Sequence, residues 1–218
     1  MVAFTGKVIG ILGGMGPEAT AELYLRIIRL LQAEGARYDA DFPEMLIYNL
    51  PLPDMVEQQG NKKAIAALLR QAIARLRDAG ADFIAIPCNT AFSYMESGEG
   101  ILSIVAETRK EIARWDGKVG VLGTEATIRS RLYEGIIPDS GDQRKVTRII
   151  MNILSGKKLR SDKDALLGIM GRLQEKGATG VVLGCTELPL LVSQKDAPIM
   201  MFDTLDVLAR AVIGRWRR

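Results

Sequence analysis

The sequence of 218 residues contains no histidine, and this absence excludes several classes of active site at once. Histidine is the commonest general base near neutral pH, the central residue of the usual catalytic triads and a ligand in most zinc sites. Acid–base chemistry in this chain must therefore come from Cys, Asp, Glu, Lys or Tyr.

The sequence also has no long apolar run and little net charge, which excludes membrane-spanning and nucleic-acid-binding proteins. No apolar run reaches the roughly 18 residues of a membrane-spanning helix, and the net charge of +3 is too small to indicate a partner nucleic acid. The apolar run after Lys7 is short, broken by glycine and without an A-x-A cleavage site, so it predicts a strand rather than a signal peptide. With two cysteines and no mark of export, we expect a cytoplasmic protein with reduced thiols.

The two cysteines occupy equivalent positions in two similar stretches of sequence. Residues 84–88 and 181–185 are short apolar runs that end in Cys88 and Cys185 and are followed by small polar residues. Each run is preceded by a helix-like segment that ends at a glycine, Gly80 or Gly177. This pattern predicts a buried strand with a cysteine at its carboxyl end, twice in the chain.

A second pair of similar segments supports an internal repeat. Residues 8–14 and 118–124 are apolar runs that end in glycine and a small residue before a helical pattern. Strands that alternate with helices predict parallel sheets, and in such sheets ligands bind beyond the carboxyl ends of the strands. We therefore expect an α/β protein of two similar Rossmann-like domains, related by pseudo-twofold symmetry, with the active site in the cleft between them. The expected domains are residues 1–100 with the returning C-terminal helix 205–218, and residues 101–204.

The glycine-rich turn that begins at Gly14 allows two interpretations. The spacing of Gly14, Gly16 and Ala19 matches a dinucleotide-binding fingerprint, but Asn49 stands where the acidic residue that ends the second strand is expected. The favoured interpretation is a turn whose backbone N–H groups approach a small anion at the start of a helix.

The chemistry is expected at the cysteines, each of which directly precedes a predicted helix start. A helix N-terminus favours the thiolate and can lower a cysteine pKa from about 8.5. A lone cysteine of this kind is more often a small buried core residue, but a matched pair in a chain without histidine favours catalysis. A thiol and a thiolate on opposite sides of a cleft can remove a proton from one face of a carbon and return one to the other face. No cofactor or metal is needed for this reaction.

Four motifs give a more specific indication. Residues 13–17 (GGMGP), 87–90 (PCNT), 122–124 (LGT) and 184–187 (GCTE) resemble, in order and spacing, the cofactor-independent aspartate/glutamate racemase family. The resemblance runs nearly end to end and implies two α/β domains, a homodimer, and two-base racemisation without pyridoxal phosphate. It implies that Cys88 and Cys185 are the catalytic acid/base pair. The substrate-binding residues that it implies are Met15, Asn89, Thr90, Thr124 and Thr186.

The sequence also departs from the family pattern. Phe92 stands where the family often has histidine, and Met55 stands where aspartate-specific members carry an arginine. Ser155 stands near the position where the family pattern has a lysine, although Lys157 and Lys158 lie close by. Compared with the family pattern, the stretch 133–136 is about ten residues short. The first three departures concern the specificity for the side chain, and the last concerns the packing of the second half.

The favoured function is interconversion of L- and D-aspartate or glutamate, with a small amino acid or dicarboxylate as the partner and no nucleic acid or membrane. One alternative is an isomerase, decarboxylase or racemase on the same scaffold that acts on another carboxylate substrate. The other is a non-catalytic protein that binds a small anion, or a redox protein that uses the cysteines as a reversible disulfide.

Overall fold

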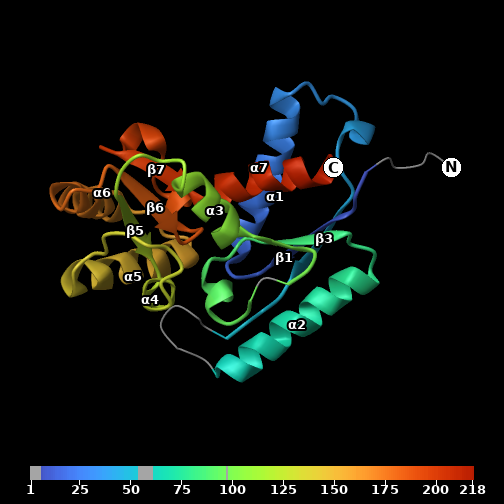
Figure 1. Ribbon diagram of the computed structural model, residues 1–218, viewed down its shortest axis with the longest axis horizontal. Helices are drawn as coiled ribbons and strands as arrows, with labels where there is room; N and C mark the ends of the chain where they lie inside the picture. The colour runs from blue at the N-terminus through green and yellow to red at the C-terminus, as the bar shows by residue number, and fades with distance from the viewer. Residues whose placement is uncertain (1–5, 54–60, 97) are drawn as a thin grey trace.

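The computed structural model describes residues 6–53, 61–96 and 98–218, which form two parallel sheets with interleaved helices (Figure 1). The α/β class predicted from the sequence is confirmed. Met55, which marks one departure from the family pattern, lies outside the described residues.

The first sheet has the strand order β2-β1-β3-β4, with all pairs parallel. The central strand β1 (Ile9–Gly13) lies between β2 (Met45–Asn49) and β3 (Phe83–Ile86), and β4 (Ile101–Ser103) pairs with the outer side of β3. The carboxyl ends of these strands therefore lie along one edge of the sheet.

The second sheet is arranged like the first, except that the strand equivalent to β2 is replaced by a single bridge. Strands β5 (Val119–Gly123), β6 (Gly180–Gly184) and β7 (Met200–Asp203) are parallel neighbours in that order. On the free side of β5, Ile136 forms one isolated parallel bridge with Gly120, at the position that β2 has in the first sheet. The shortened stretch 133–136 thus retains one bridge where a full strand could lie.

The two inner strands of the first sheet, β1 and β3, are buried on both faces because helices cover both faces of the sheet there. Ile9 and Ile11 of β1 belong to a core formed with α1 (Pro17–Ala33) and α7 (Thr204–Trp216). Leu12, which points the other way, belongs to the core formed with α2 (Lys62–Asp78). Continuous apolar runs are typical of such strands in parallel sheets.

The second sheet is covered mainly by α5 (Ser140–Leu154) and α6 (Arg160–Glu175), whose buried faces form one core with β6. The short helix α4 (Glu125–Arg129) follows β5 and begins at Thr124, whose side chain accepts from the backbone N–H of Thr127. Thr124 is therefore the N-cap of α4.

The C-terminal helix α7 returns from the second sheet to the first and packs against α1 and α3 (Ile104–Ile112) (Figure 1). The first sheet extends to Ser103, because β4 pairs with β3. The division into two domains, residues 1–100 with 205–218 and residues 101–204, stays a prediction.

Two predicted helices are shorter in the structure. The turns after the cysteines are 3₁₀ helices, Thr90–Ser93 and Leu188–Leu190, rather than α-helices. Helix α4 is also short and ends at Arg129. Arg131 has a left-handed backbone conformation, with φ of 47°, and the chain then enters the core at Tyr133.

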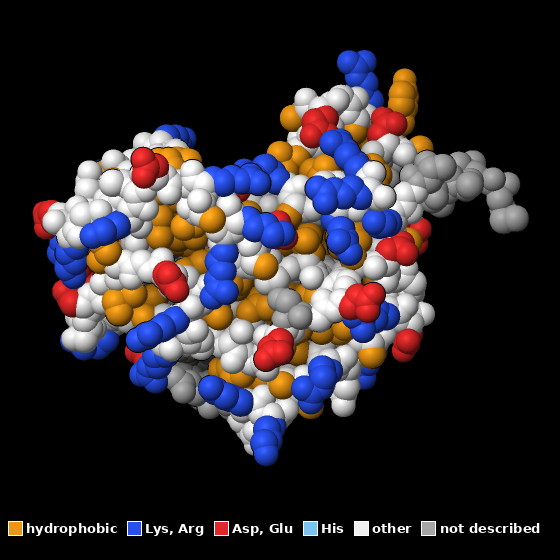
Figure 2. Space-filling view, viewed as in Figure 1, with side chains coloured by type: hydrophobic (Ala, Val, Ile, Leu, Met, Phe, Trp, Pro, Cys, Tyr) orange, Lys and Arg blue, Asp and Glu red, His pale blue; other side chains and the backbone are white. Residues whose placement is uncertain are grey.

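In the described ranges, each helix is too short or too polar to cross a bilayer. Figure 2 shows basic and acidic side chains interspersed over one face of the protein, as expected for a small net charge.

The packing of α7 can be tested with two leucines. Leu208 of α7 is fully buried, whereas Leu25 of α1 is 41% exposed. We expect Leu208→Ala to lower the free energy of unfolding by about 2–5 kcal/mol, because it leaves a cavity in the core. Leu25→Ala should change it by only about 0.5 kcal/mol. Urea denaturation measures both, and equal losses would contradict the packing of α7 described here.

Candidate active site

The loops that follow five strands meet at one cavity of about 160 Å³. These loops leave the carboxyl ends of β1, β2 and β3 in the first sheet and of β5 and β6 in the second, and the last residue of α5 completes the wall. This is where ligands bind in open α/β sheets. All the site residues predicted from the sequence line this cavity: Met15, Cys88, Asn89, Thr90, Thr124, Cys185 and Thr186. Their roles stay predictions.

The two cysteines reach the cavity from different sheets. Cys88 belongs to the core under α2, and Cys185 belongs to the core of the second sheet. Both are free thiols, 4% and 6% exposed. The charge of Cys88 contributes to the raised pKa of Cys185, so the two sulfur atoms are close enough to interact electrostatically.

The pKa values of the thiols differ from the expectation. Burial raises the pKa of Cys88 to about 12 and that of Cys185 well above its ordinary value. The negative charge of Glu187 raises both pKa values further, whereas backbone N–H groups of Thr90 and Ala91 lower that of Cys88. The prediction of lowered pKa values is wrong for this structure, because desolvation outweighs the donors of a single 3₁₀ turn.

Glu187 is the charged residue of the cavity, and it is only 4% exposed. Its Oε2 atom accepts a hydrogen bond from Cys185 Sγ at 3.0 Å, and its Oε1 atom accepts one from the backbone N–H of Gly16 at 3.2 Å. Burial raises the pKa of Glu187, and these hydrogen bonds oppose the rise. The glycine turn thus binds an anion at a helix start, as expected, but the anion is a carboxylate of the protein itself.

Glu187 is the last residue of the GCTE motif, but the sequence alone did not predict it as a residue of the active site. The available signal was its position, two residues after Cys185 at the end of a buried strand. Gly16 has no room for a side chain, because an added Cβ would lie 2.9 Å from Glu187 Oε1 and 2.7 Å from Leu154 Cδ2. This close approach explains the glycine on physical grounds.

The amide of Asn89 is fixed at both ends. Tyr133 OH donates to Asn89 Oδ1 at 2.5 Å, and Asn89 Nδ2 donates to Thr204 Oγ1 at 3.1 Å. The hydroxyl of Thr204 in turn donates to the backbone carbonyl of Leu183 at 2.9 Å. Because its oxygen is already engaged, Asn89 presents its second N–H group as a donor for a ligand.

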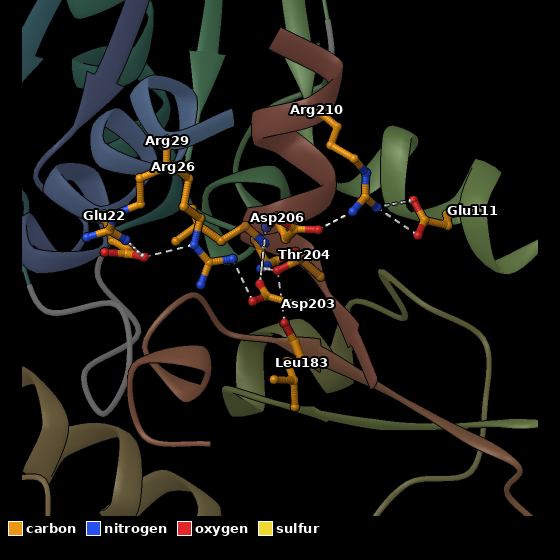
Figure 3. A network of polar contacts seen from close by, with 11 residues as sticks. Glu22, Arg26, Arg29, Glu111, Leu183, Asp203, Thr204, Asp206 and Arg210 are labelled. Carbon is orange, nitrogen blue, oxygen red and sulfur yellow. Dashed lines mark hydrogen bonds and ion pairs between the residues drawn. The ribbon is translucent and has the colours of Figure 1, made fainter. Parts of the chain in front are cut away.

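The start of α7 that carries Thr204 is itself held in place (Figure 3). Asp203 accepts from the backbone N–H groups of Leu205 and Asp206 and forms an ion pair with Arg26 of α1 at 2.6 Å. Helix α7 is thereby fixed relative to α1 at the point where it supports Asn89.

Hydroxyl groups connect the two halves across the cavity. Thr90 Oγ1, after β3, lies 2.9 Å from Thr124 Oγ1, after β5. Thr186 Oγ1, after β6, lies 3.3 Å from both the carbonyl of Pro87 and Glu187 Oε2, so its one proton serves one of them at a time. These contacts leave hydroxyl lone pairs and protons available to a polar ligand.

Comparison with known proteins identifies the family. The model of the Asp/Glu/Hydantoin racemase family matches residues 12–212. The chain belongs to this family. It is 31% identical over 222 residues to the broad specificity amino-acid racemase RacX of Bacillus subtilis, with 95% of this chain and 97% of that protein covered.

Solved structures of racemases have the same fold. An aspartate racemase from Picrophilus torridus superposes with a TM-score of 0.81 at 25% identity, covering 96% of this chain and 94% of that one. An aspartate racemase homologue from Pyrococcus horikoshii gives 0.73 at 26% identity, covering 95% and 98%. The resemblance inferred from the four motifs is therefore confirmed at the level of the family.

The described residues at which the sequence departs from the family pattern do not line the cavity. Phe92 packs against the cores of the first half, and Ser155 lies directly after the end of α5. Lys158, one of the two lysines just beyond, forms an ion pair with Glu18 of α1 and does not line the cavity.

The role of Tyr133 can be tested by removing its hydroxyl group. In Tyr133→Phe the Asn89 amide loses the donor that fixes its orientation, so we expect KM for the amino acid to rise by about tenfold. Tyr24→Phe, at a residue 38% exposed on α1, is the control and should leave KM unchanged. An unaltered KM in Tyr133→Phe, measured with correctly folded protein, would contradict the positioning role.

The electrostatic effect of Glu187 can be tested through the reactivity of the thiols. Glu187→Gln removes the negative charge that raises both cysteine pKa values, so more thiolate should form at pH 8 and alkylation by iodoacetamide should accelerate. Parallel measurements with Cys88→Ser and Cys185→Ser assign the rates to each thiol. Glu125→Gln, at a half-exposed carboxylate of α4, should have no effect. A slower or unchanged rate in Glu187→Gln would refute this account of the pKa values.

Proposed function

We propose that the protein interconverts the enantiomers of an amino acid by proton transfer between two bases, Cys88 and Cys185, without pyridoxal phosphate. The observation that carries the proposal is the placement of two buried thiols, one from each sheet, on a single cavity that also offers hydrogen-bond donors. Membership of a racemase family and similarity to a broad specificity amino-acid racemase support the same reaction.

The donors around the thiols suit the α-carboxylate and α-amino groups of the substrate. Asn89 contributes an amide N–H, and Thr90, Thr124 and Thr186 contribute hydroxyl groups, while Met15 lies beside the substrate. When a proton leaves Cα, negative charge spreads into the carboxylate. Donors that are already oriented stabilise this charge without the cost of rearranging water.

The protons can be followed through one turnover. Cys185 passes its proton to Glu187, to which it is already hydrogen-bonded, and becomes the thiolate. The thiolate removes the Cα proton from one face of the substrate, and the Cys88 thiol delivers its proton to the other face. The enzyme then holds Cys185 as thiol and Cys88 as thiolate, which is the form that reacts with the opposite enantiomer.

The raised pKa values fit this scheme once the substrate is included. Burial raises the pKa of both thiols, which favours their protonated forms at neutral pH. The ammonium group of an amino acid brings a positive charge, which favours a thiolate nearby. The reactive thiolate is thus formed mainly when a substrate is bound.

The assembly and compartment are further parts of this proposal. The family resemblance favours a homodimer, and two free thiols favour a reducing compartment such as the cytoplasm.

Single-cysteine variants test the two-base scheme. In Cys88→Ser and Cys185→Ser, racemisation should fall by at least about a thousandfold, since one face of Cα loses its acid or base. Each variant should still exchange the α-proton of one enantiomer with D₂O, and the two variants should differ in which one. Proton NMR and chiral chromatography measure both. Retained racemisation in either variant would overturn the proposal.

A further inference from the structure

The cavity has a polar part and an apolar part that come from different elements. The polar side chains follow β3, β5 and β6, as described above. The apolar side chains follow β1 and β2 or end α5; they are Pro17, at the start of α1, and Met15, Leu52, Pro53 and Leu154. Since the polar part suits the groups that all amino acids share, the apolar part is left for the side chain.

The charges around the cavity exclude a second carboxylate. Among the described residues, the lining includes Glu187 and no lysine or arginine. Residues 54–60, which follow Pro53 in the sequence, contain no basic residue either. Two lysines, Lys157 and Lys158, follow Leu154 closely in the sequence; neither lines the cavity, and Lys158 is already paired with Glu18. A carboxylate in the apolar part would therefore lose its hydration without gaining a cation, in a cavity that already holds one buried carboxylate.

Leu154 holds the apolar part close to the reacting groups. Its Cδ2 atom lies within 2.7 Å of the point where a Cβ on Gly16 would stand, and the N–H of Gly16 binds Glu187. Leu154 therefore lies next to Gly16, whose N–H group binds the carboxylate of Glu187. That carboxylate also accepts a hydrogen bond from Cys185. A substrate with its Cα between the thiols would place its side chain against this leucine.

We propose that the preferred substrates have uncharged, aliphatic side chains, and that Met15, Leu52, Pro53 and Leu154 form the side-chain subsite. The proposal rests on the proposed racemase function and sets its specificity apart from that of an enzyme for aspartate or glutamate. A hydrophobic subsite gains affinity with each buried methylene group, whereas an acidic side chain finds no partner there.

A panel of matched amino acids tests the specificity. The racemisation rates of L-leucine and L-methionine are compared with those of L-aspartate and L-glutamate, and each acid is paired with its amide isostere. We expect kcat/KM for leucine and methionine to exceed that for either acid by at least about tenfold, and each amide to exceed its acid. Equal or faster turnover of aspartate or glutamate would overturn the inference and leave the racemase function intact. If no amino acid reacts, the racemase function itself fails, and the inference with it.

A charge placed in the subsite should reverse the preference. In Leu154→Arg, we expect the ratio of kcat/KM for aspartate to that for leucine to rise by at least about tenfold, because the guanidinium supplies the missing cation. Leu159→Arg is the matched control. Leu154 and Leu159 are 41% and 44% exposed, so both positions tolerate a polar side chain, but only Leu154 lines the cavity. An unchanged ratio in Leu154→Arg, with the protein folded and active on leucine, would show that the side chain binds elsewhere.

Discussion

The proposed reaction needs two bases on opposite faces of one carbon, and the chain must therefore bring two side chains to the same cavity from two directions. Parallel strands achieve it, because their carboxyl ends share one edge of a sheet and two sheets can turn these edges toward each other. Cys88 follows β3 of one sheet, and Cys185 follows β6 of the other. The hydroxyl contacts between the two halves and the return of α7 to the first sheet keep the two edges together.

Burial gives the site its particular electrostatics. It raises the pKa values of both thiols and of Glu187, so the charged forms are unfavourable unless a partner arrives. An amino acid is such a partner, since its ammonium group favours a thiolate and its carboxylate meets oriented donors. The same low polarity discriminates against a second carboxylate on the substrate. In this account, reactivity and specificity both follow from the burial of Cys88, Cys185 and Glu187.

The sequence revealed the parts of the site that depend on local pattern. Apolar runs that end in glycine or cysteine located the strand ends, and these placed Cys88, Cys185 and Thr124 on one cavity. It could not reveal contacts between distant residues, such as Tyr133 with Asn89 or Gly16 with Glu187, because these depend on how the two halves meet. The pKa values were misjudged for the same reason, since a helix start is visible in a sequence whereas the depth of burial is not. Short elements were also missed, because four residues are too few to distinguish the period of a 3₁₀ turn, about 3.0 residues, from that of an α-helical turn, about 3.6 residues.

The central claim is that two separate thiols exchange protons with the two faces of Cα. The most direct measurement is the position of deuterium at early times when the wild-type protein racemises one pure enantiomer in D₂O. A thiol carries a single proton, so at early times, before that proton exchanges with water, the base that removes the substrate proton returns the same proton, while the opposite thiol delivers deuterium from solvent. The account predicts deuterium at Cα of the newly formed enantiomer and protium in the remaining substrate. Deuterium appearing equally in both enantiomers, or inversion with the original proton retained, would contradict it.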